Sequence, residues 1–227
     1  MEWVFTGLLI ATVVSLVLTL IVHLQLHLKI SNPPEPTGAV PDISVLKPMK
    51  GVDDGLWENL VAIAEQDYPG EYEILLGAAD ANDPALEIAH RLRREYPDQD
   101  IRVFVCDDPV GMNPKVNNLA YMTEYARHDH LLVSDSNVRP KPSYLRQTAA
   151  ELEKDDVRMV SNIFAGSGEK SLAALFENLH LNSLIVSSLC GSETIGHPVV
   201  VGKSMLVSRH DLEELGGWEH VADVLAE

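Results

Sequence analysis

Two stretches, residues 76–80 (LGAAD) and residues 132–137 (LVSDSN), decide the fold that we expect for this chain. Each closes a short apolar run with an aspartate, Asp80 or Asp135, and loop-forming residues follow. Strands of an open α/β sheet end in this way, and ligands of such sheets bind at the carboxyl ends of the strands. We therefore expect Asp80 and Asp135 to lie at adjacent strand ends and to face one cleft.

Strand-like and helix-like segments alternate along the rest of the chain. This alternation predicts an α/β fold with a mainly parallel sheet covered by helices on both faces. We expect strands at residues 43–46, 72–78, 101–105, 131–134, 158–163 and 205–208, and helices at residues 56–65, 84–95, 114–127, 142–153 and 172–189.

The first 30 residues predict a transmembrane anchor. From Trp3 to Val22 the chain is almost entirely apolar and carries no charge. A run of this length can span a bilayer as a helix. It lacks the basic start and small-residue cleavage site of a cleaved signal peptide. The alternative, a buried core helix, is disfavoured because globular helices are seldom apolar all round. The weak positive bias after the helix favours a single-pass anchor with the following domain in the cytoplasm.

Composition narrows the class of protein further. The 227 residues include 34 acidic and 17 basic residues, giving a net charge of -17. This balance argues against a nucleic-acid partner, because nucleic-acid binders carry a basic footprint. Cys106 and Cys190 match no zinc spacing; one disulfide is an open alternative, and two buried free thiols are favoured for a cytosolic domain. Residues 31–41 read as a proline-rich linker.

Three aspartates are the sharpest candidates for chemistry: Asp80, Asp83 and Asp135. Carboxylates are the oxygen ligands that magnesium or manganese takes together with substrate phosphates. A carboxylate at a strand end can instead bind a ribose or a base edge. Asp83 has a competing structural role, because it precedes Pro84 as a helix N-cap would. Turn formation is an equal alternative for Asp80 and for Asp135 when each is taken alone.

A second candidate is the start of the helix at Pro114. Free amides and the helix dipole favour anions there, and Lys115 adds a positive charge in the first turn. Because a lysine at a helix N-terminus opposes the dipole, a diphosphate facing it explains its position better than solvent does. Asn117 and Asn118 are poor helix formers, and we expect one of them to hydrogen-bond into the site.

Other features of the sequence give weaker indications of function. No GxGxxG fingerprint and no Walker loop is present, which disfavours a dehydrogenase. The helix at residues 172–189 has few charges. We expect its apolar side to lie in a membrane interface, because Asn178, His180 and Asn182 make a full span improbable.

Several of these stretches together resemble the ceramide glucosyltransferases of glycosyltransferase family 21, which include bacterial hopanoid-biosynthesis relatives. Residues 45–53 (VLKPMKGVD), 65–69 (EQDYP) and 72–77 (YEILLG) are similar to the opening of that family. Residues 80–85 (DANDPA) and 135–139 (DSNVR) resemble its two aspartate motifs, and residues 110–119 (VGMNPKVNNL) its central motif. The resemblance runs from about Ser44 to the last residue.

The resemblance implies a GT-A-like domain at residues 42–227, within the family 2-like group. It implies an inverting, metal-assisted transfer of a sugar from a UDP-sugar such as UDP-glucose to a lipid hydroxyl such as that of ceramide. A hopanoid- or polyprenyl-directed transferase and a non-catalytic nucleotide-sugar-binding remnant are the alternatives. The implied metal is Mg²⁺ or Mn²⁺ on Asp135, and the implied donor-binding residues are Lys47, Asp80, Lys115, Asn117, Asp135 and Asn137.

The chain departs from the family pattern at its end. Residues 216–218 (GGW) and 226–227 (AE) match the approach to a third aspartate, the implied catalytic base, which would follow Glu227. The later Gln-x-x-Arg-Trp motif is also absent. We therefore expect this chain alone to bind a nucleotide sugar weakly and to transfer it poorly, because a lipid alcohol needs a general base to attack well.

Overall fold

The computed structural model describes residues 2–224, and the chain divides into two compact units. The smaller unit comprises residues 1–33 and 163–199, and the larger unit comprises residues 34–162 and 200–227. The segment 163–199, which the sequence analysis places inside one domain at residues 42–227, thus clusters with the N-terminal helix.

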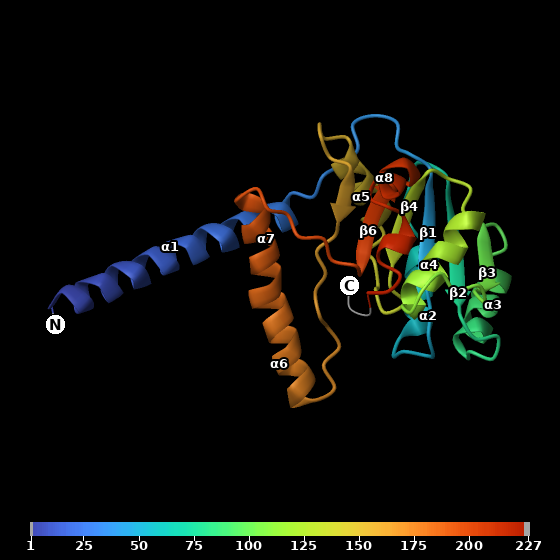
Figure 1. Cartoon of the computed structure of the whole chain (residues 1–227), viewed down its shortest axis with the longest axis horizontal. Coiled ribbons are helices and arrows are strands. Elements are labelled where there is room, and N and C mark those ends of the chain that lie inside the picture. The colour runs from blue at the N-terminus through green and yellow to red at the C-terminus, as the bar shows by residue number, and fades with distance from the viewer. Residues whose placement is uncertain (1, 225–227) are drawn as a thin grey trace. The chain divides into compact units, whose positions relative to one another are not determined.

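The larger unit is built on a six-stranded sheet in the order β3-β2-β1-β4-β6-β5 (Figure 1). Strand β1 pairs in parallel with β2 and with β4, and β2 pairs in parallel with β3. Strand β6 runs antiparallel to β4 and to β5. The mainly parallel sheet is thus confirmed, and β6 is the strand that departs from it. The strands are β1 (Ile43–Pro48), β2 (Tyr72–Ala78), β3 (Ile101–Val105), β4 (His130–Ser134), β5 (Met159–Ser161) and β6 (Ser204–Ser208).

Helices cover both faces of this sheet, as predicted. Alternate strand residues point to opposite faces: Val45 belongs to the core with α2 (Leu56–Ala64), α3 (Ala85–Glu95) and α5 (Tyr144–Leu152). Its neighbour Leu46 belongs to the core with α4 (Pro114–Tyr125). The second core also takes in the buried Trp218, whose indole N–H donates to Thr123 Oγ1 at 2.9 Å. The short elements α8 (Arg209–Glu214) and η2 (Trp218–His220) complete the unit.

The expected elements agree with the structure to within two residues at each end, apart from the predicted helix 172–189. Helix α4 ends at Tyr125 instead of residue 127, and β5 keeps only three residues of the predicted strand 158–163. The predicted helix 172–189 runs as α6 (Leu172–His180), a π-helical turn η1 (Leu181–Ile185) and α7 (Val186–Thr194). Because π-helical turns are rare and occur as single turns inside α-helices, the sequence favours a continuous α-helix over these residues.

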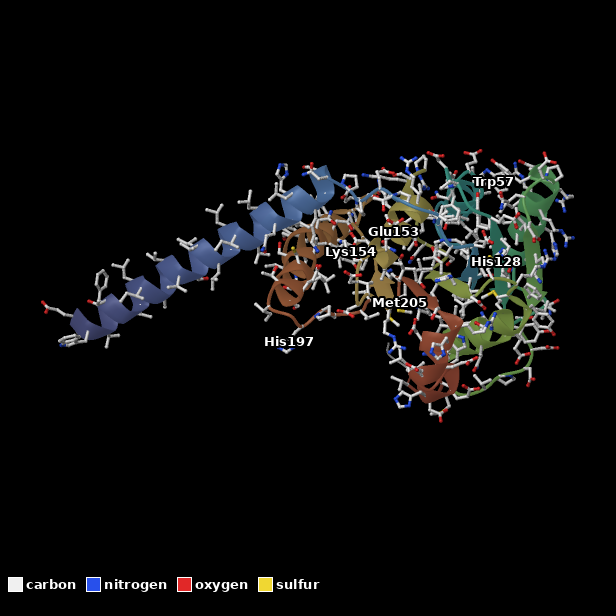
Figure 2. The ribbon with its side chains drawn as sticks, turned by 90° about the horizontal axis from the view of Figure 1, so that it is seen from above. Trp57, His128, Glu153, Lys154, His197 and Met205 are labelled. Carbon is white, nitrogen blue, oxygen red and sulfur yellow. The ribbon has the colours of Figure 1, made fainter. Side chains whose placement is uncertain are left out.

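The smaller unit consists of α1 (Glu2–Ser31), α6, η1 and α7. Most side chains of α1 are exposed, and Figure 2 shows them standing away from its ribbon. By length and composition, both Glu2–Ser31 and Leu172–Thr194 could cross a membrane. Within this unit Val22 and Leu26 of α1 pack against Val186 and Cys190 of α7. The thiols Cys106 and Cys190 are both free and buried.

Candidate functional site

The predicted aspartates follow two strands whose carboxyl ends share one edge of the sheet. Asp80 lies after β2 and Asp135 directly after β4, and both strands run parallel to β1. The two strands are not adjacent, however, because β1 lies between them. The expectation that the two aspartates follow adjacent strands is therefore wrong, because one strand separates them. A sequence can indicate that strands are parallel, but it does not give their order in the sheet.

Asp135 and Lys115 form an ion pair at this edge. Lys115 Nζ lies 3.0 Å from Asp135 Oδ1, and each side chain is about one quarter exposed (24% and 22%). The same ammonium donates to the backbone oxygen of Gly202 at 3.0 Å. The Asp135 N–H donates to the Lys203 backbone oxygen, also at 3.0 Å. Three segments therefore meet here: the start of α4, the end of β4 and the approach to β6.

The local sequence explains why Lys115 can occupy the first turn of α4. Asn113 is the N-cap, and its side-chain oxygen accepts from the N–H groups of Lys115 at 3.0 Å and Val116 at 3.3 Å. Pro114 follows at the first helical position, where its missing N–H costs nothing. A lysine here opposes the helix dipole, and the Asp135 carboxylate compensates for it. Lys115 thus has a protein partner that the sequence did not reveal.

Lys47, predicted to bind the donor, is fully buried beneath the loop that carries Asp135. Its ammonium donates to Ser134 Oγ at 3.1 Å and to the backbone oxygens of Asp135 at 2.8 Å and Val138 at 3.4 Å. Burial lowers the pKa of Lys47 to about 7, and the Asp135 charge opposes this shift. In this structure Lys47 fixes the course of the loop from below.

The two asparagines of α4 form hydrogen bonds, Asn117 with the loop before the helix and Asn118 with strand β2. Asn117 Oδ1 accepts from the N–H groups of Val110 at 3.1 Å and Gly111 at 2.9 Å, and its Nδ2 donates to the Gly111 oxygen at 2.9 Å. Asn118 is buried, and its Nδ2 donates to the Gly77 oxygen at 3.5 Å. The predicted site residue Asn117 thus holds its own loop closed.

The remaining predicted residues differ in exposure. Asp80 is exposed and accepts from the Asn82 N–H at 2.8 Å, a local turn contact. Asp83 accepts from the N–H groups of Ala85 at 2.9 Å and Gly51 at 2.9 Å. The N-cap of α3 is Pro84 and not Asp83 as expected, but Asp83 binds the first N–H of this helix and also holds the loop after β1. Asn137 is exposed, and its Oδ1 lies 3.5 Å from Lys203 Nζ.

Three further residues at this edge were not predicted from the sequence. Gly202 and Lys203 were missed because nothing in the sequence indicated that β6 turns back beside β4. Asn59, buried in α2, donates to the Ser136 oxygen at 3.0 Å and so also supports the Asp135 loop. A polar residue within an apolar helix pattern was the available signal for Asn59.

The C-terminal part of the described chain also reaches this region. The N–H of Asn113 donates to the Ala222 oxygen at 2.8 Å, and Asn113 Nδ2 donates to the Val224 oxygen at 2.7 Å. A Cβ on Gly111 would lie 2.5 Å from the Ala222 Cβ, so this approach requires glycine. Residues 222–224 are thereby fixed beside the helix that carries Lys115.

A divalent cation would find few protein ligands here. Among residues 2–224 no group of three or more His, Cys, Asp or Glu side chains could hold a metal. Magnesium, however, is commonly bound through one or two carboxylates, with substrate phosphates as further ligands. Asp135 and the amide oxygen of Asn137, two residues on, fit that kind of site.

The fold and this arrangement at the strand ends define a GT-A-like glycosyltransferase domain. The solved structure of the mannosyltransferase PcManGT from Pyrobaculum calidifontis, in complex with GDP-Man and Mn²⁺, is similar to this chain with a TM-score of 0.58 and 20% identity. The likeness covers 91% of this chain and 56% of that one. Glucosyl-3-phosphoglycerate synthase from Mycobacterium tuberculosis, in complex with Mn²⁺ and UDP, gives a TM-score of 0.51 at 15% identity, covering 76% of this chain and 58% of that one.

The sequence model of glycosyl transferase family 21 matches residues 7–227, and the chain belongs to this family. Ceramide glucosyltransferase 1 of Caenorhabditis elegans is 28% identical over 204 residues, covering 89% of this chain and 43% of that protein. Ceramide glucosyltransferase of Komagataella phaffii is 33% identical over 144 residues, covering 61% of this chain and 27% of that protein. The chain thus spans less than half the length of these curated relatives.

Proposed function

We propose that this chain is the donor-binding part of a membrane-anchored glucosyltransferase that moves glucose from UDP-glucose to the hydroxyl of ceramide, with inversion. The observation that carries the proposal is the Lys115–Asp135 pair at the carboxyl edge of the sheet, 3.0 Å apart and partly exposed. Both residues lie in segments that resemble motifs of ceramide glucosyltransferases, and Asp135 ends a parallel strand, where α/β sheets bind their ligands.

The chain's own residues divide the work of holding a donor. The Lys115 ammonium is placed to leave Asp135 and pair with the diphosphate, which releases the carboxylate. Asp135 and Asn137 supply oxygens for Mg²⁺ or Mn²⁺, which when bound would neutralise charge on the leaving nucleoside diphosphate. Lys47 and Asn59 hold the Asp135 loop in place through its backbone oxygens. Asp80, exposed at the end of β2, is the candidate for contacts with the nucleoside.

The first prediction concerns Lys115. Lys115→Ala should weaken UDP-glucose binding by about 1.5–3 kcal/mol, typical of a hydrogen bond to a charged group, and Lys115→Glu should weaken it more through repulsion. Isothermal titration calorimetry on the full chain in detergent, with Mn²⁺ present, measures both effects. Lys141→Ala, at an exposed lysine, is the matched control and should bind normally. An equal loss of affinity for uridine, which lacks phosphates, would reject phosphate recognition.

The second prediction separates the metal from the diphosphate. Asp135→Asn keeps the shape of the side chain but removes its charge, so Mn²⁺ should no longer strengthen UDP-glucose binding. Asp129→Asn, at an exposed residue just before the other end of β4, should retain the full metal effect. Calorimetry with and without Mn²⁺ gives both comparisons. If Asp135→Asn kept its response to the metal, the cation would have to bind elsewhere.

The acceptor and the membrane complete the proposal. A lipid substrate suits a chain whose first helix is long and apolar enough to cross a bilayer, with the larger unit in the cytoplasm. Transfer of radiolabelled glucose to ceramide, compared with hopanoid and polyprenol acceptors in detergent, tests the acceptor. Tighter binding of GDP-mannose than of UDP-glucose would overturn the donor assignment whatever the acceptor result.

A further inference from the structure

The smaller unit carries an uncovered apolar stripe on α6. Four residues follow the spacing of one helix face and are exposed: Leu172 (75%), Leu175 (40%), Phe176 (69%) and Leu179 (54%). No residue of α6 is buried. Isolated exposed apolar residues are ordinary, but a contiguous apolar stripe on one helix marks an interaction surface.

Polar side chains beside the stripe, one in α6 and one in η1, hold the loop that precedes the helix. Asn182 accepts from the Gly166 N–H and donates to the Gly166 oxygen, both at 2.8 Å. One turn earlier, Asn178 donates to Glu169 Oε1 at 2.8 Å. A Cβ on Gly166 would collide with the Asn178 side chain, so the loop backbone lies directly on this face. The loop therefore lies along one flank of the helix, while the four residues of the apolar stripe remain exposed.

The contacts between α7 and α1 show at which point along the proposed anchor the helical segment Leu172–Thr194 lies. The apolar run of α1 ends at Val22, and about 20 helical residues match the ~30 Å hydrocarbon thickness. The contacts from α7 begin at that residue: Gly191 lies against Val22, Ser187 lies 3.4 Å from the His23 ring, and Thr194 donates to Gln25 at 2.8 Å. A pair between Lys29 and Glu193 follows.

These observations lead to a specific placement. We propose that Leu172–Thr194 does not cross the membrane but lies in the bilayer interface, with Leu172, Leu175, Phe176 and Leu179 inserted among the lipids. Where α7 meets α1, the anchor leaves the hydrocarbon. A full crossing would also put Glu177 and the loop bound to Asn178 and Asn182 into lipid, which is costly. The inference rests on the membrane anchoring proposed above.

The chemistry of the stripe indicates what kind of lipid surface it fits. Leu172–Thr194 contains no lysine or arginine, so attraction to anionic headgroups adds nothing to its binding. Burial of apolar side chains supplies the affinity, as for interfacial helices that lie ~5–10 Å into the headgroup boundary. The occupant is thus the surface of a bilayer of any headgroup charge, including pure phosphatidylcholine.

Single cysteines carrying an environment-sensitive fluorophore test this placement in the full chain reconstituted into vesicles. The native Cys106 and Cys190 are 4% and 1% exposed and should not compete for the label. Phe176→Cys and Leu179→Cys report the stripe, Glu177→Cys reports the neighbouring exposed position, and Leu9→Cys reports the anchor. Quenching by nitroxide lipids, with the nitroxide either at the headgroup or near the bilayer centre, gives the depth of each label.

The inference expects the Phe176 and Leu179 labels to be quenched most at the headgroup level, the Glu177 label to remain in water and the Leu9 label to be deep. The same depths should appear in phosphatidylcholine vesicles and in vesicles with phosphatidylserine. Strongest quenching of the Phe176 label near the bilayer centre would mean a second span and overturn the inference. A water-exposed Phe176 label beside a deep Leu9 label would overturn it as well. A Leu9 label in water would instead reject the anchor itself.

Discussion

Replacing Glu73 by alanine should destabilise the larger unit by about 3–5 kcal/mol, the cost of breaking a buried ion pair from one side. Only 1% of the Glu73 side chain is exposed, and it pairs with Arg102 on the neighbouring strand. It also accepts from Ser44 Oγ and from the Arg127 N–H, both at 2.6 Å. One carboxylate thereby ties together β1, β2, β3 and the turn before β4. Its loss would leave these donors without an acceptor.

The effect of Glu73 should also depend on pH. Burial alone would raise its pKa, but the bonds from Arg127, Ser44 and Arg102 outweigh burial, and the net pKa is lowered. A carboxyl group whose folded pKa is depressed stabilises the fold above its unfolded pKa, and this contribution is lost as the pH falls through the folded value. The wild-type chain should therefore lose more stability in acid than Glu73→Gln does.

Urea unfolding of the full chain in detergent, followed by tryptophan fluorescence, measures both effects, because Trp57 and the buried Trp218 lie in the larger unit. Glu73→Gln keeps an oxygen for Ser44 and Arg127 but not the charge for Arg102, so its cost should be smaller, about 1.5–3 kcal/mol. Glu71→Ala, at an exposed residue just before the same strand, should stay within about 0.5 kcal/mol. Because Glu73 lies near the opposite end of β2 from the candidate site, UDP-glucose affinity should be unchanged in Glu73→Gln. A parallel loss of affinity would contradict this separation.

The sequence was a good guide to elements and a poorer guide to their spatial neighbours. Apolar periodicity and the Asn113-Pro114 helix start identified five of the six strands and α4 closely, because these signals are local. The order of the strands depends on long-range packing, so the position of β1 between the two aspartate strands could not be read. The antiparallel return of β6, which brings Gly202 to Lys115, was hidden for the same reason.

The candidate site shows the same limit at the level of single side chains. Residue type and motif position indicated Lys47, Lys115, Asn117 and Asp135. Lys47 binds the loop that carries Asp135, Asp135 pairs with Lys115, and Asn117 binds the loop before α4. The sequence could not show which groups these side chains contact. Lys47 and Asn117 turn toward backbone oxygens and N–H groups of the protein, since buried polar backbone groups must be satisfied somewhere. Their influence on a donor would act through the loops that they hold.

The second large effect is expected at Lys47. Lys47→Ala should lower the free energy of unfolding by about 3–5 kcal/mol. It opens a cavity where a long, fully buried side chain lay and leaves three hydrogen-bond acceptors without a donor. Lys47→Met keeps most of that volume, so its cost should fall to about 1–3 kcal/mol, the penalty for acceptors left without a partner. Lys50→Ala, at an exposed lysine three residues further on, should change stability by no more than about 0.5 kcal/mol.

The Lys47 charge provides a readout that distinguishes it from an ordinary packing residue. Its pKa is about 7 in the folded chain against an ordinary value of 10.5, mainly because of burial. Between these two values the unfolded chain binds more protons than the folded chain, so the free energy of unfolding should rise with pH across this window. In Lys47→Met this rise should be smaller, as measured by urea unfolding at a series of pH values. Lys47→Met should also weaken UDP-glucose binding, because the Asp135 and Val138 oxygens lose the ammonium that holds their loop. An unchanged pH dependence together with unchanged donor affinity would show that Lys47 only fills space.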